Sequence, residues 1–161
     1  MSHTVHPYSH RLGIIRDWKS KWFALHSTYR GNLKADILIR EYLHKRLKGM
    51  FIGGVEIERG SKTTRVVIKT GRPGMLIGRS GDGSVKLRND IIKALKREKI
   101  VMPVDFKLDI EEVRSPESSA PIVAEMIAEG LEKRVPFRRV MKQMVEKVMS
   151  NREVQGIKIY V

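Results

Sequence analysis

The stretch RVVIKTGRPGMLIGRSGDGSVKLRNDIIKAL, residues 65–95, decides the fold of this chain. Its β-branched run predicts a strand over Arg65–Thr70, which a turn ends at Gly71-Arg72-Pro73-Gly74. A short apolar segment, Met75–Ile77, leads into the loop Gly78-Arg79-Ser80-Gly81. The spacing of the apolar residues after this loop predicts a long helix. The stretch therefore places a loop bounded by two glycines between a short and a long helical segment.

Apolar residues at helical spacing predict a helix on either side of the strand region. In the helix after the loop they recur every four residues, as Leu87, Ile91 and Leu95. Upstream, the segment Leu33–Lys48 shows helical periodicity and is expected to end at Gly49. Its apolar face consists of Leu38, Ile39, Tyr42, Leu43 and Leu47. Ion pairs at i,i+4 spacing are expected between Asp36 and Arg40 and between Glu41 and Lys45.

Two further segments predict strands. Val55–Arg59 precedes Arg65–Thr70, and Gly60-Ser61-Lys62 between them predicts a hairpin. After a boundary at Pro103, alternating apolar residues predict a strand over Val104–Glu111. The expected order is helix, strand, strand, short helix, helix, strand, which indicates an α+β domain.

A second domain is expected after the serine-rich stretch Val113–Ser119, which marks a boundary. Helical spacing predicts helices over Pro121–Lys133 and Pro136–Ser150. Ile157–Val161 predicts a strand that stops just as it needs partners. We therefore expect the chain to end before its second domain does.

The N-terminal residues show no sustained periodicity. If Asp17–Leu25 is a short helix, Trp18, Trp22 and Phe23 lie together, and we interpret these three aromatic residues as a packing anchor. The remainder is interpreted as a basic or neutral arm that becomes ordered on RNA.

The composition favours a polyanionic partner and excludes several other classes of function. The 161 residues contain 32 Lys and Arg against 18 Asp and Glu, a formal net charge of +14, and the isoelectric point is near 10.2. So strong a positive field attracts phosphates. No stretch approaches the ~18 apolar residues of a membrane span, and none forms a secretory signal, so a cytoplasmic location is expected. The absence of Cys excludes disulfides and thiolate chemistry.

No arrangement of residues for catalysis or for metal binding is identifiable in the sequence. His3, His6 and His10 have the spacing of metal ligands on a helix, but Pro7 interrupts such a helix. Every His precedes residue 45, and no Ser–His–Asp or paired-carboxylate set is present. The glycine loop lacks the Lys of a phosphate-binding P-loop, which disfavours nucleotide hydrolysis. We predict neither an enzyme nor a bound cofactor.

The loop Gly78-Arg79-Ser80-Gly81 is the first candidate RNA-binding site. Glycines have no Cβ and let a phosphate backbone approach closely, the following helix supplies free amides, and Arg79 supplies a cation. Asp82, directly after the loop, can cap the helix, although its charge also repels phosphate. Taken alone, such a loop is more often a tight turn. The surrounding order of helices and strands is what favours RNA.

The second candidate site is a cationic face on the predicted helix Pro136–Ser150. Arg138, Arg139 and Lys142 fall within an arc of about 100°. The neighbouring arc is apolar and consists of Phe137, Met141, Met144, Val145 and Val148. Additional basic contacts are expected from Arg72, Lys133 and Arg134. A solvated helix flank is the simpler interpretation, but Glu146 is the single nearby counter-charge on this helix, which favours phosphate binding.

Several well-spaced blocks of the sequence carry a family resemblance. They are Val5-His6-Pro7, Arg11-Leu12-Gly13-Ile14, Trp18 through Trp22-Phe23-Ala24, Ile39-Arg40-Glu41-Tyr42-Leu43, Arg72-Pro73-Gly74 with Ile77-Gly78, Leu131-Glu132-Lys133-Arg134-Val135 and Phe137-Arg138-Arg139-Val140-Met141-Lys142. In this order they resemble the ribosomal protein S3 family of bacterial type. The resemblance spans essentially the whole chain.

The resemblance implies a type II KH domain in the head of the small (30S) ribosomal subunit, where it binds 16S ribosomal RNA beside ribosomal proteins S10 and S14. It also implies that Arg138, Arg139 and Lys142 match a basic motif that holds messenger RNA at the channel by which it enters. Cations there assist passive unwinding of the message during translation, without ATP. The family continues beyond the equivalent of Val161.

These observations divide the chain into three parts: an N-terminal arm with the aromatic anchor (1–32), a type II KH domain (33–112), and the first two helices and a strand of an incomplete α+β domain (113–161). The alternative function is a KH-type assembly or transcription factor that binds RNA outside the ribosome. A KH module attached to a GTPase would require a P-loop, and this sequence contains none.

Overall fold

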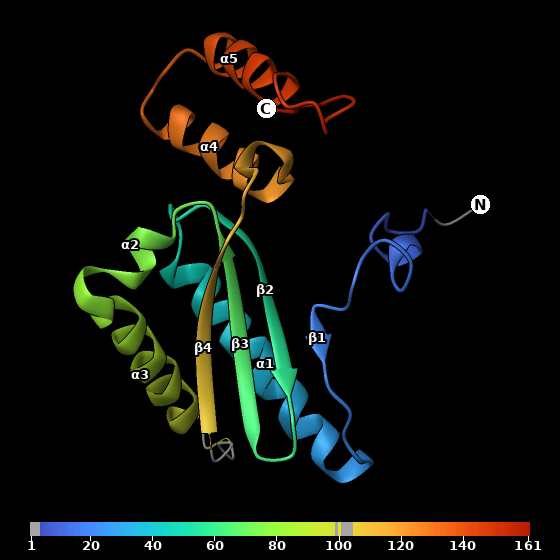
Figure 1. Ribbon diagram of the computed structural model, residues 1–161, viewed down its shortest axis with the longest axis vertical. Helices are drawn as coiled ribbons and strands as arrows, with labels where there is room; N and C mark the ends of the chain where they lie inside the picture. Colours follow the sequence, from blue (N-terminus) through green and yellow to red (C-terminus); the bar gives the residue numbers. More distant parts are fainter. Residues whose placement is uncertain (1–3, 99, 101–104) are drawn as a thin grey trace.

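The computed structural model describes residues 4–98, 100 and 105–161 and shows a four-stranded sheet with strand order β1-β2-β3-β4 (Figure 1). Two helices, drawn in orange and red, lie beyond one end of the sheet, and the N-terminal segment lies beside it. Within the described residues, no helix is both long and apolar enough to cross a membrane.

The sheet is built around an antiparallel hairpin. Strands β2 (Ile52–Arg59) and β3 (Thr63–Thr70) pair antiparallel, and Ile57 lies opposite Val66. The amide of Gly60 donates to the carbonyl oxygen of Thr63 at 2.9 Å and closes the turn. The hairpin predicted from the sequence is therefore confirmed.

The two outer strands both run parallel to their neighbours. β4 (Asp105–Glu112) pairs with β3, with Val66 opposite Leu108, and β1 (Ser20–Lys21) pairs with β2. The third predicted strand is confirmed over Asp105–Glu112, whereas its expected first residue, Val104, and the expected boundary at Pro103 lie outside the described residues.

Five α-helices and three short 3-10 helices complete the described structure. The α-helices are α1 (His26–Arg46), α2 (Pro73–Ile77), α3 (Asp82–Arg97), α4 (Ala120–Glu132) and α5 (Phe137–Met149). The 3-10 helices are η1 (Ser9–Arg11), η2 (Arg79–Gly81) and η3 (Pro116–Ser118). The short and the long helix around the loop and the two later helices are confirmed. The first long helix begins at His26, seven residues before its predicted start at Leu33.

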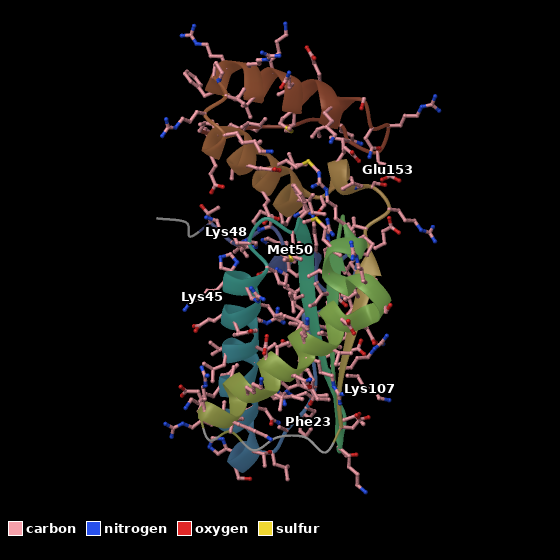
Figure 2. The ribbon with its side chains drawn as sticks, turned by 90° about the vertical axis from the view of Figure 1, so that its left-hand side faces the viewer. Phe23, Lys45, Lys48, Met50, Lys107 and Glu153 are labelled. Carbon is pink, nitrogen blue, oxygen red and sulfur yellow. The ribbon has the colours of Figure 1, made fainter. Side chains whose placement is uncertain are left out.

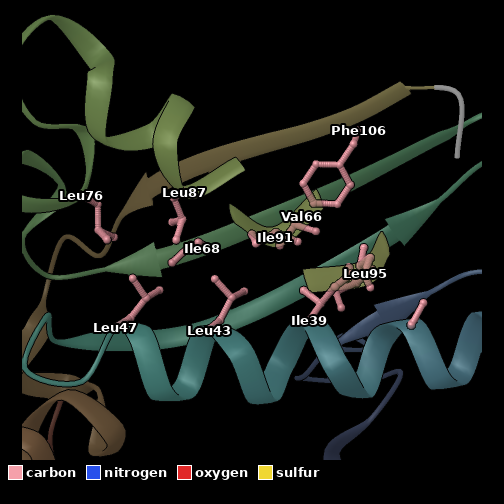
Figure 3. Close-up of a cluster of buried hydrophobic side chains, with 12 residues drawn as sticks. Ile39, Leu43, Leu47, Val66, Ile68, Leu76, Leu87, Ile91, Leu95 and Phe106 are labelled. Atoms are coloured by element: carbon pink, nitrogen blue, oxygen red, sulfur yellow. The ribbon is translucent and has the colours of Figure 1, made fainter. Parts of the chain in front are cut away.

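One hydrophobic core lies between α1, α3 and one face of the sheet (Figure 3). α1 contributes Ala35, Ile39, Leu43 and Leu47, and α3 contributes Leu87, Ile91 and Leu95. The sheet and α2 contribute Ile57, Val66, Ile68, Phe106 and Leu76. Every one of these side chains is at most 5% exposed. Residues whose spacing predicted the two helices are thus the ones that pack in the core. A helix presents the same face to the core every 3.6 residues.

The opposite face of the sheet carries a network of ion pairs. Lys21 Nζ lies 3.7 Å from Glu56 and 3.8 Å from Glu58, and Arg65 pairs with Glu58 at 3.5 Å. Arg65 also pairs with Asp109. Since these cations are matched by carboxylates on neighbouring strands, the free positive charge of the chain lies elsewhere.

Helix α4 is fastened to the end of the sheet. Ile122 is fully buried, and its Cδ1 atom packs beside Gly53, since a Cβ at Gly53 would lie 3.4 Å from it. The carboxylate of Glu125 accepts hydrogen bonds from the amides of Gly49 and Ile52. The KH-like part and the later helices are therefore joined by buried apolar contact and by two charge-assisted hydrogen bonds.

The helix predicted for Asp17–Leu25 is not formed, and that prediction is wrong. Ser20 and Lys21 are in β1, and the amide of Ile57 donates to the carbonyl oxygen of Lys19 at 2.9 Å. Arg40 donates to the same carbonyl at 2.8 Å. Contacts distant in sequence thus hold the segment extended and override its local spacing.

The expected aromatic anchor is wrong as well. Trp18 is 58% exposed and Phe23 is 90% exposed, whereas Trp22 lies alone of the three against α1. The Trp22 ring packs against Tyr29 with 5.2 Å between ring centroids, and its Nε1 donates to Asp36 Oδ2 at 2.7 Å. In an extended segment successive side chains point to opposite sides, so adjacent Trp22 and Phe23 are separated.

The expected ion pair between Asp36 and Arg40 is replaced by a buried one. Asp36 pairs with Arg59 of β2, whose Nη2 and Nε donate to Oδ1 at 2.5 and 2.8 Å. Arg40 instead donates to the carbonyl oxygen of Val55 at 2.7 Å. Among the described residues Glu41 and Lys45 form no ion pair either. Asp36 is held by the sheet, because the buried carboxylate needs the donors that β2 and Trp22 bring to it.

The strand predicted for Ile157–Val161 is not formed. These residues follow α5 without ladder hydrogen bonds to another strand. A strand is stable only when a partner satisfies its backbone groups, and none of the four strands in the sheet lies beside this segment (Figure 1).

Replacing Asp36 with Ala is expected to lower the free energy of unfolding by about 3–5 kcal/mol, because it leaves the buried Arg59 guanidinium unpaired. Urea unfolding followed by circular dichroism measures this change. As a control, Glu98→Ala removes one partner of the exposed Lys34–Glu98 pair and should cost less than about 1 kcal/mol. Equal effects of the two substitutions would contradict the role given to the buried pair.

Candidate nucleic-acid interface

The loop between α2 and α3 adopts a left-handed backbone at three of its four positions. The φ angles are 69° at Gly78, 54° at Ser80 and 84° at Gly81. Glycine adopts such angles without steric cost, so the two glycines suit the turn. Arg79 and Ser80 are exposed at its tip, and among the described residues Arg79 forms no ion pair. The loop thus presents backbone amides and one free guanidinium to solvent.

Helix α3 begins directly behind this loop without a side-chain cap. The amide of Asp82, the first residue of α3, donates to the carbonyl oxygen of Arg79. The expected cap at Asp82 is wrong, because Asp82 is the first helical residue and Gly81 occupies the cap position. Ser84 Oγ donates to the carbonyl oxygen of Gly81 at 2.8 Å and steadies the first turn.

Gly83 is a packing constraint beside the loop that the sequence interpretation missed. A Cβ at this residue would lie 2.4 Å from the carbonyl oxygen of Leu76 and 2.9 Å from that of Ile77. Only glycine therefore lets α3 pack against the end of α2. The available signal was a third glycine two residues after Gly81, in the sequence Gly81-Asp82-Gly83.

The cationic face of α5 is exposed, as its spacing predicts. Arg138, Arg139 and Lys142 all face solvent, and none of them forms an ion pair within the described part of the chain. Val140 and Val148 are buried on the other side of the helix and hold it against the preceding structure. A rigid helix thus presents three unpaired cations.

The apolar arc beside that face is only partly buried. Phe137 is 52% exposed and Val145 is 38% exposed, so these two residues of the apolar arc are not part of a buried core. The Arg138 guanidinium carbon lies 5.8 Å from the centroid of the Phe137 ring. α5 packs on α4 and on η3 and lies away from the sheet (Figure 1), so part of its apolar surface is uncovered within the described chain.

Two of the three additional basic residues are engaged within the molecule. Lys133 Nζ donates to Glu129 at 2.6 Å, and this hydrogen bond lowers the pKa of the Glu129 carboxyl. The Arg72 guanidinium lies 4.1 Å from the centroid of the Phe51 ring, at the junction of the sheet with α4. Arg134 ends α4 with a φ of 59° and is exposed.

The loop and the cationic helix do not converge on a single site. The loop lies beside α3, whereas α5 lies on the far side of α4 from the sheet (Figure 1).

The histidine spacing in the N-terminal arm, which resembles that of metal ligands, stays untested, because His3 lies outside the described residues. His6 Nδ1 accepts a hydrogen bond from the amide of Tyr8 at 3.1 Å.

The fold and the loop define the class of protein. Residues 38–118 match a family model described as KH domain, and the observed order of helices and strands over α1 to β4 is the one expected for its type II form. This is a KH-domain chain, with a further pair of helices after the KH domain.

Comparison with curated proteins identifies the family. The chain is 39% identical over 158 residues to small ribosomal subunit protein uS3 of Clostridium novyi, covering 98% of this chain and 68% of that protein. It is 44% identical over 149 residues to uS3 of Xanthomonas campestris, covering 92% and 58%. It is 42% identical over 161 residues to uS3 of Stutzerimonas stutzeri, covering 100% and 67%. The chain belongs to the uS3 family of small ribosomal subunit proteins, and it spans 58 to 68% of the length of these relatives.

Replacing Gly83 with Ala is expected to destabilise the chain by about 1–3 kcal/mol and to move the loop, because the new methyl group must push α3 away from Leu76. Chemical denaturation and the amide NMR shifts of residues 76–84 measure the two effects. Gly74→Ala is the matched control, since a Cβ at Gly74 meets nothing within 4 Å. If Gly83→Ala leaves both the stability and the amide shifts as in the Gly74 control, the close packing is not a constraint.

Proposed function

We propose that the chain is an RNA-binding structural component of the small ribosomal subunit and that its KH domain docks on 16S ribosomal RNA. Its membership in the uS3 family supports this role. The observation that carries the proposal is the exposed loop 78–81 ahead of an uncapped helix, which is an arrangement suited to phosphate.

The chemistry of the loop is electrostatic and geometric. An RNA phosphate can approach the backbone at Gly78 and Gly81 because no side chain intervenes. The positive end of the α3 dipole then lies near the phosphate, and Arg79 supplies a full positive charge. The carboxylate of Asp82 opposes the anion, so we assign this loop to docking within a larger interface rather than to tight isolated binding.

For α5 we propose contact with messenger RNA at the channel by which it enters the subunit. Arg138, Arg139 and Lys142 are exposed and unpaired on one side of a packed helix, which supports a phosphate-binding role. Cations at fixed positions hold the single-stranded messenger RNA as translocation pulls it. This contact opposes the re-formation of base pairs in the message. The mechanism is passive and uses no ATP.

The remaining contacts proposed for this chain are with proteins. Ribosomal proteins S10 and S14 are the neighbours implied by the family resemblance, in the head of the subunit.

Residence in the ribosome is tested by expressing the tagged chain in bacteria and sedimenting small subunits through a high-salt wash. We expect the chain to remain with the subunits. Gly78→Asp with Gly81→Asp should reduce this retention, because two carboxylates face the phosphate. Gly31→Asp with Gly156→Asp, which adds the same charge at exposed glycines, should not. Release under mild salt would instead indicate the alternative, a KH-type factor outside the ribosome.

The role of α5 is tested by replacing Arg138, Arg139 and Lys142 together with Ala. Each lost phosphate contact removes about 0.7 from the slope of log K against log salt for a single strand, so the slope should fall by about 2. Fluorescence anisotropy with a single-stranded RNA at several salt concentrations measures this. The control variant replaces Arg30, near the start of α1, and Lys96 and Arg97, at the end of α3, and removes the same charge. These helix ends lie at the end of the sheet away from α4 and α5 (Figure 1). Equal changes in slope in the two variants would show that α5 is no preferred phosphate site.

A further inference from the structure

Residues 49–52, which lead from the end of α1 into β2, form a turn with an uncommon backbone. The φ angle is 84° at Gly49 and 54° at Phe51, on either side of Met50. Glycine adopts such angles freely, but a bulky aromatic residue seldom does. We call this segment the 49–52 turn. Figure 2 labels Lys48 and Met50 where α1 ends, close to the orange helix α4.

Two amides of the 49–52 turn meet a single carboxylate. The amide of Gly49 donates to Oε1 of Glu125, and the amide of Ile52 donates to Oε2 at 3.2 Å. Each oxygen of the carboxylate thus accepts one hydrogen bond from the backbone. Backbone N–H groups that converge in a turn form a concave site for an anion, which is called a nest. The 49–52 turn is therefore a nest that a side chain of α4 occupies.

The shape of the nest is fixed by contacts within the KH domain. Phe51 is only 2% exposed, and its carbonyl oxygen accepts hydrogen bonds from the Gly71 amide at 3.0 Å and from Thr70 Oγ1 at 3.3 Å. The Arg72 guanidinium covers the Phe51 ring, with 4.1 Å between its carbon and the ring centroid. All of these residues lie within the part of the chain that matches the KH family model. α4 therefore supplies only the anion.

A second carboxylate of α4 also meets the KH domain, but in a different way. Glu132 lies seven residues after Glu125, on the same side of the helix, and is 3.3 Å from Lys48 Nζ. Both of these side chains are exposed, and exposed ion pairs contribute little. Glu125 is half-buried, and its partners are backbone amides that a change of rotamer cannot move. Glu125 is thus the contact that can fix a direction.

The position of α5 relative to the sheet depends on how α4 is held. α5 packs on α4 and on η3, and Val140 lies against Gly130 of α4, where a Cβ would be 3.2 Å from its methyl carbons. Ile122 holds α4 to the end of the sheet by apolar contact, which has no preferred direction. Hydrogen bonds do have one. The two bonds to Glu125 therefore set the angle at which α4 and α5 leave the sheet.

We propose that the 49–52 turn is an anion-binding nest whose resident ligand is the Glu125 carboxylate, and that this contact is a latch that positions α4 and α5 on the KH domain. Glu125 is thus a positioning residue. An emptied nest accepts a different anion, such as inorganic phosphate. The inference goes beyond the proposed function, since it concerns the joint between two parts of the chain and holds whichever RNA they bind.

The latch is tested by a distance across the joint. The chain has no Cys, so spin labels can be placed specifically at Asn89→Cys on α3 and Gln143→Cys on α5, both exposed. Pulsed electron paramagnetic resonance measures the distribution of distances between them. In Glu125→Ala this distribution should become about twofold wider, because apolar contact alone does not fix the direction of α4.

Glu132→Ala is the matched control, since it removes the same charge from an exposed pair on the same helix. It should leave the width of the distribution unchanged. Equal widths in Glu125→Ala and Glu132→Ala overturn the latch.

Glu125→Gln keeps the volume of the side chain and tests its two acceptor oxygens. The amide group replaces one oxygen by a donor, which then faces a backbone N–H. The distribution should therefore broaden while circular dichroism shows that the chain remains folded. A width equal to that of the unaltered chain overturns the proposal, even if Glu125→Ala does not fold.

The nest itself is tested by titrating the ¹⁵N-labelled chain with inorganic phosphate at constant ionic strength. In Glu125→Ala the amide resonances of Gly49 and Ile52 should move and then saturate. In the unaltered chain they should move about tenfold less, because the tethered carboxylate occupies the site at high effective concentration. Resonances that stay unmoved in Glu125→Ala, or that move equally in the unaltered chain, overturn the nest. No RNA is present, so failure here and failure of the proposed function are distinguishable.

Discussion

The close approach of α3 to the end of α2 is the constraint on which the shape of the loop between these helices depends. A methyl group at Gly83 would lie 2.4 Å from the carbonyl oxygen of Leu76. The helix cannot retreat, because Leu87 and Ile91 are buried against α1 and the sheet. The four residues between the helices must therefore turn back within a very short distance, which requires left-handed angles at Gly78 and Gly81. Core packing thus sets the shape of a loop that has no buried side chains of its own.

A second constraint couples that loop to the cationic helix. Ile122 of α4 is fully buried where Gly53 and Gly71 leave room for it, and Glu125 accepts hydrogen bonds from amides at the start of the sheet. Glu125 is half-buried, and its two hydrogen bonds to backbone amides fix how α4 sits on the end of the sheet. The glycine loop and the cationic face of α5 thereby belong to parts of the chain that are joined through α4.

The spacing of apolar residues predicted most of the helices and strands. It failed where contacts between residues distant in sequence determine the local structure. The spacing of Leu87, Ile91 and Leu95 predicted α3 because the residues of one helix face are close in sequence. The same reasoning paired Asp36 with Arg40, although Arg59 on β2 lies closer to the carboxylate in the folded chain. It also placed a helix at Asp17–Leu25, where β2 offers its edge to Ser20 and Lys21 instead. The candidate loop was located correctly by its glycines, but the need for Gly83 appears only when α2 and α3 are brought together.

The sequence by itself determined the order of helices and strands, the position of the glycine loop, the excess of positive charge and the row of cations on α5. These properties depend on residues within a few turns of one another or on composition, so no knowledge of the fold is needed to find them. The tertiary structure alone decided which cations are free and which are paired, how α4 joins the sheet, and that the amides of Gly49 and Ile52 meet the carboxylate of Glu125. Those properties depend on distances between residues far apart in the chain, and these distances exist only once the core has formed.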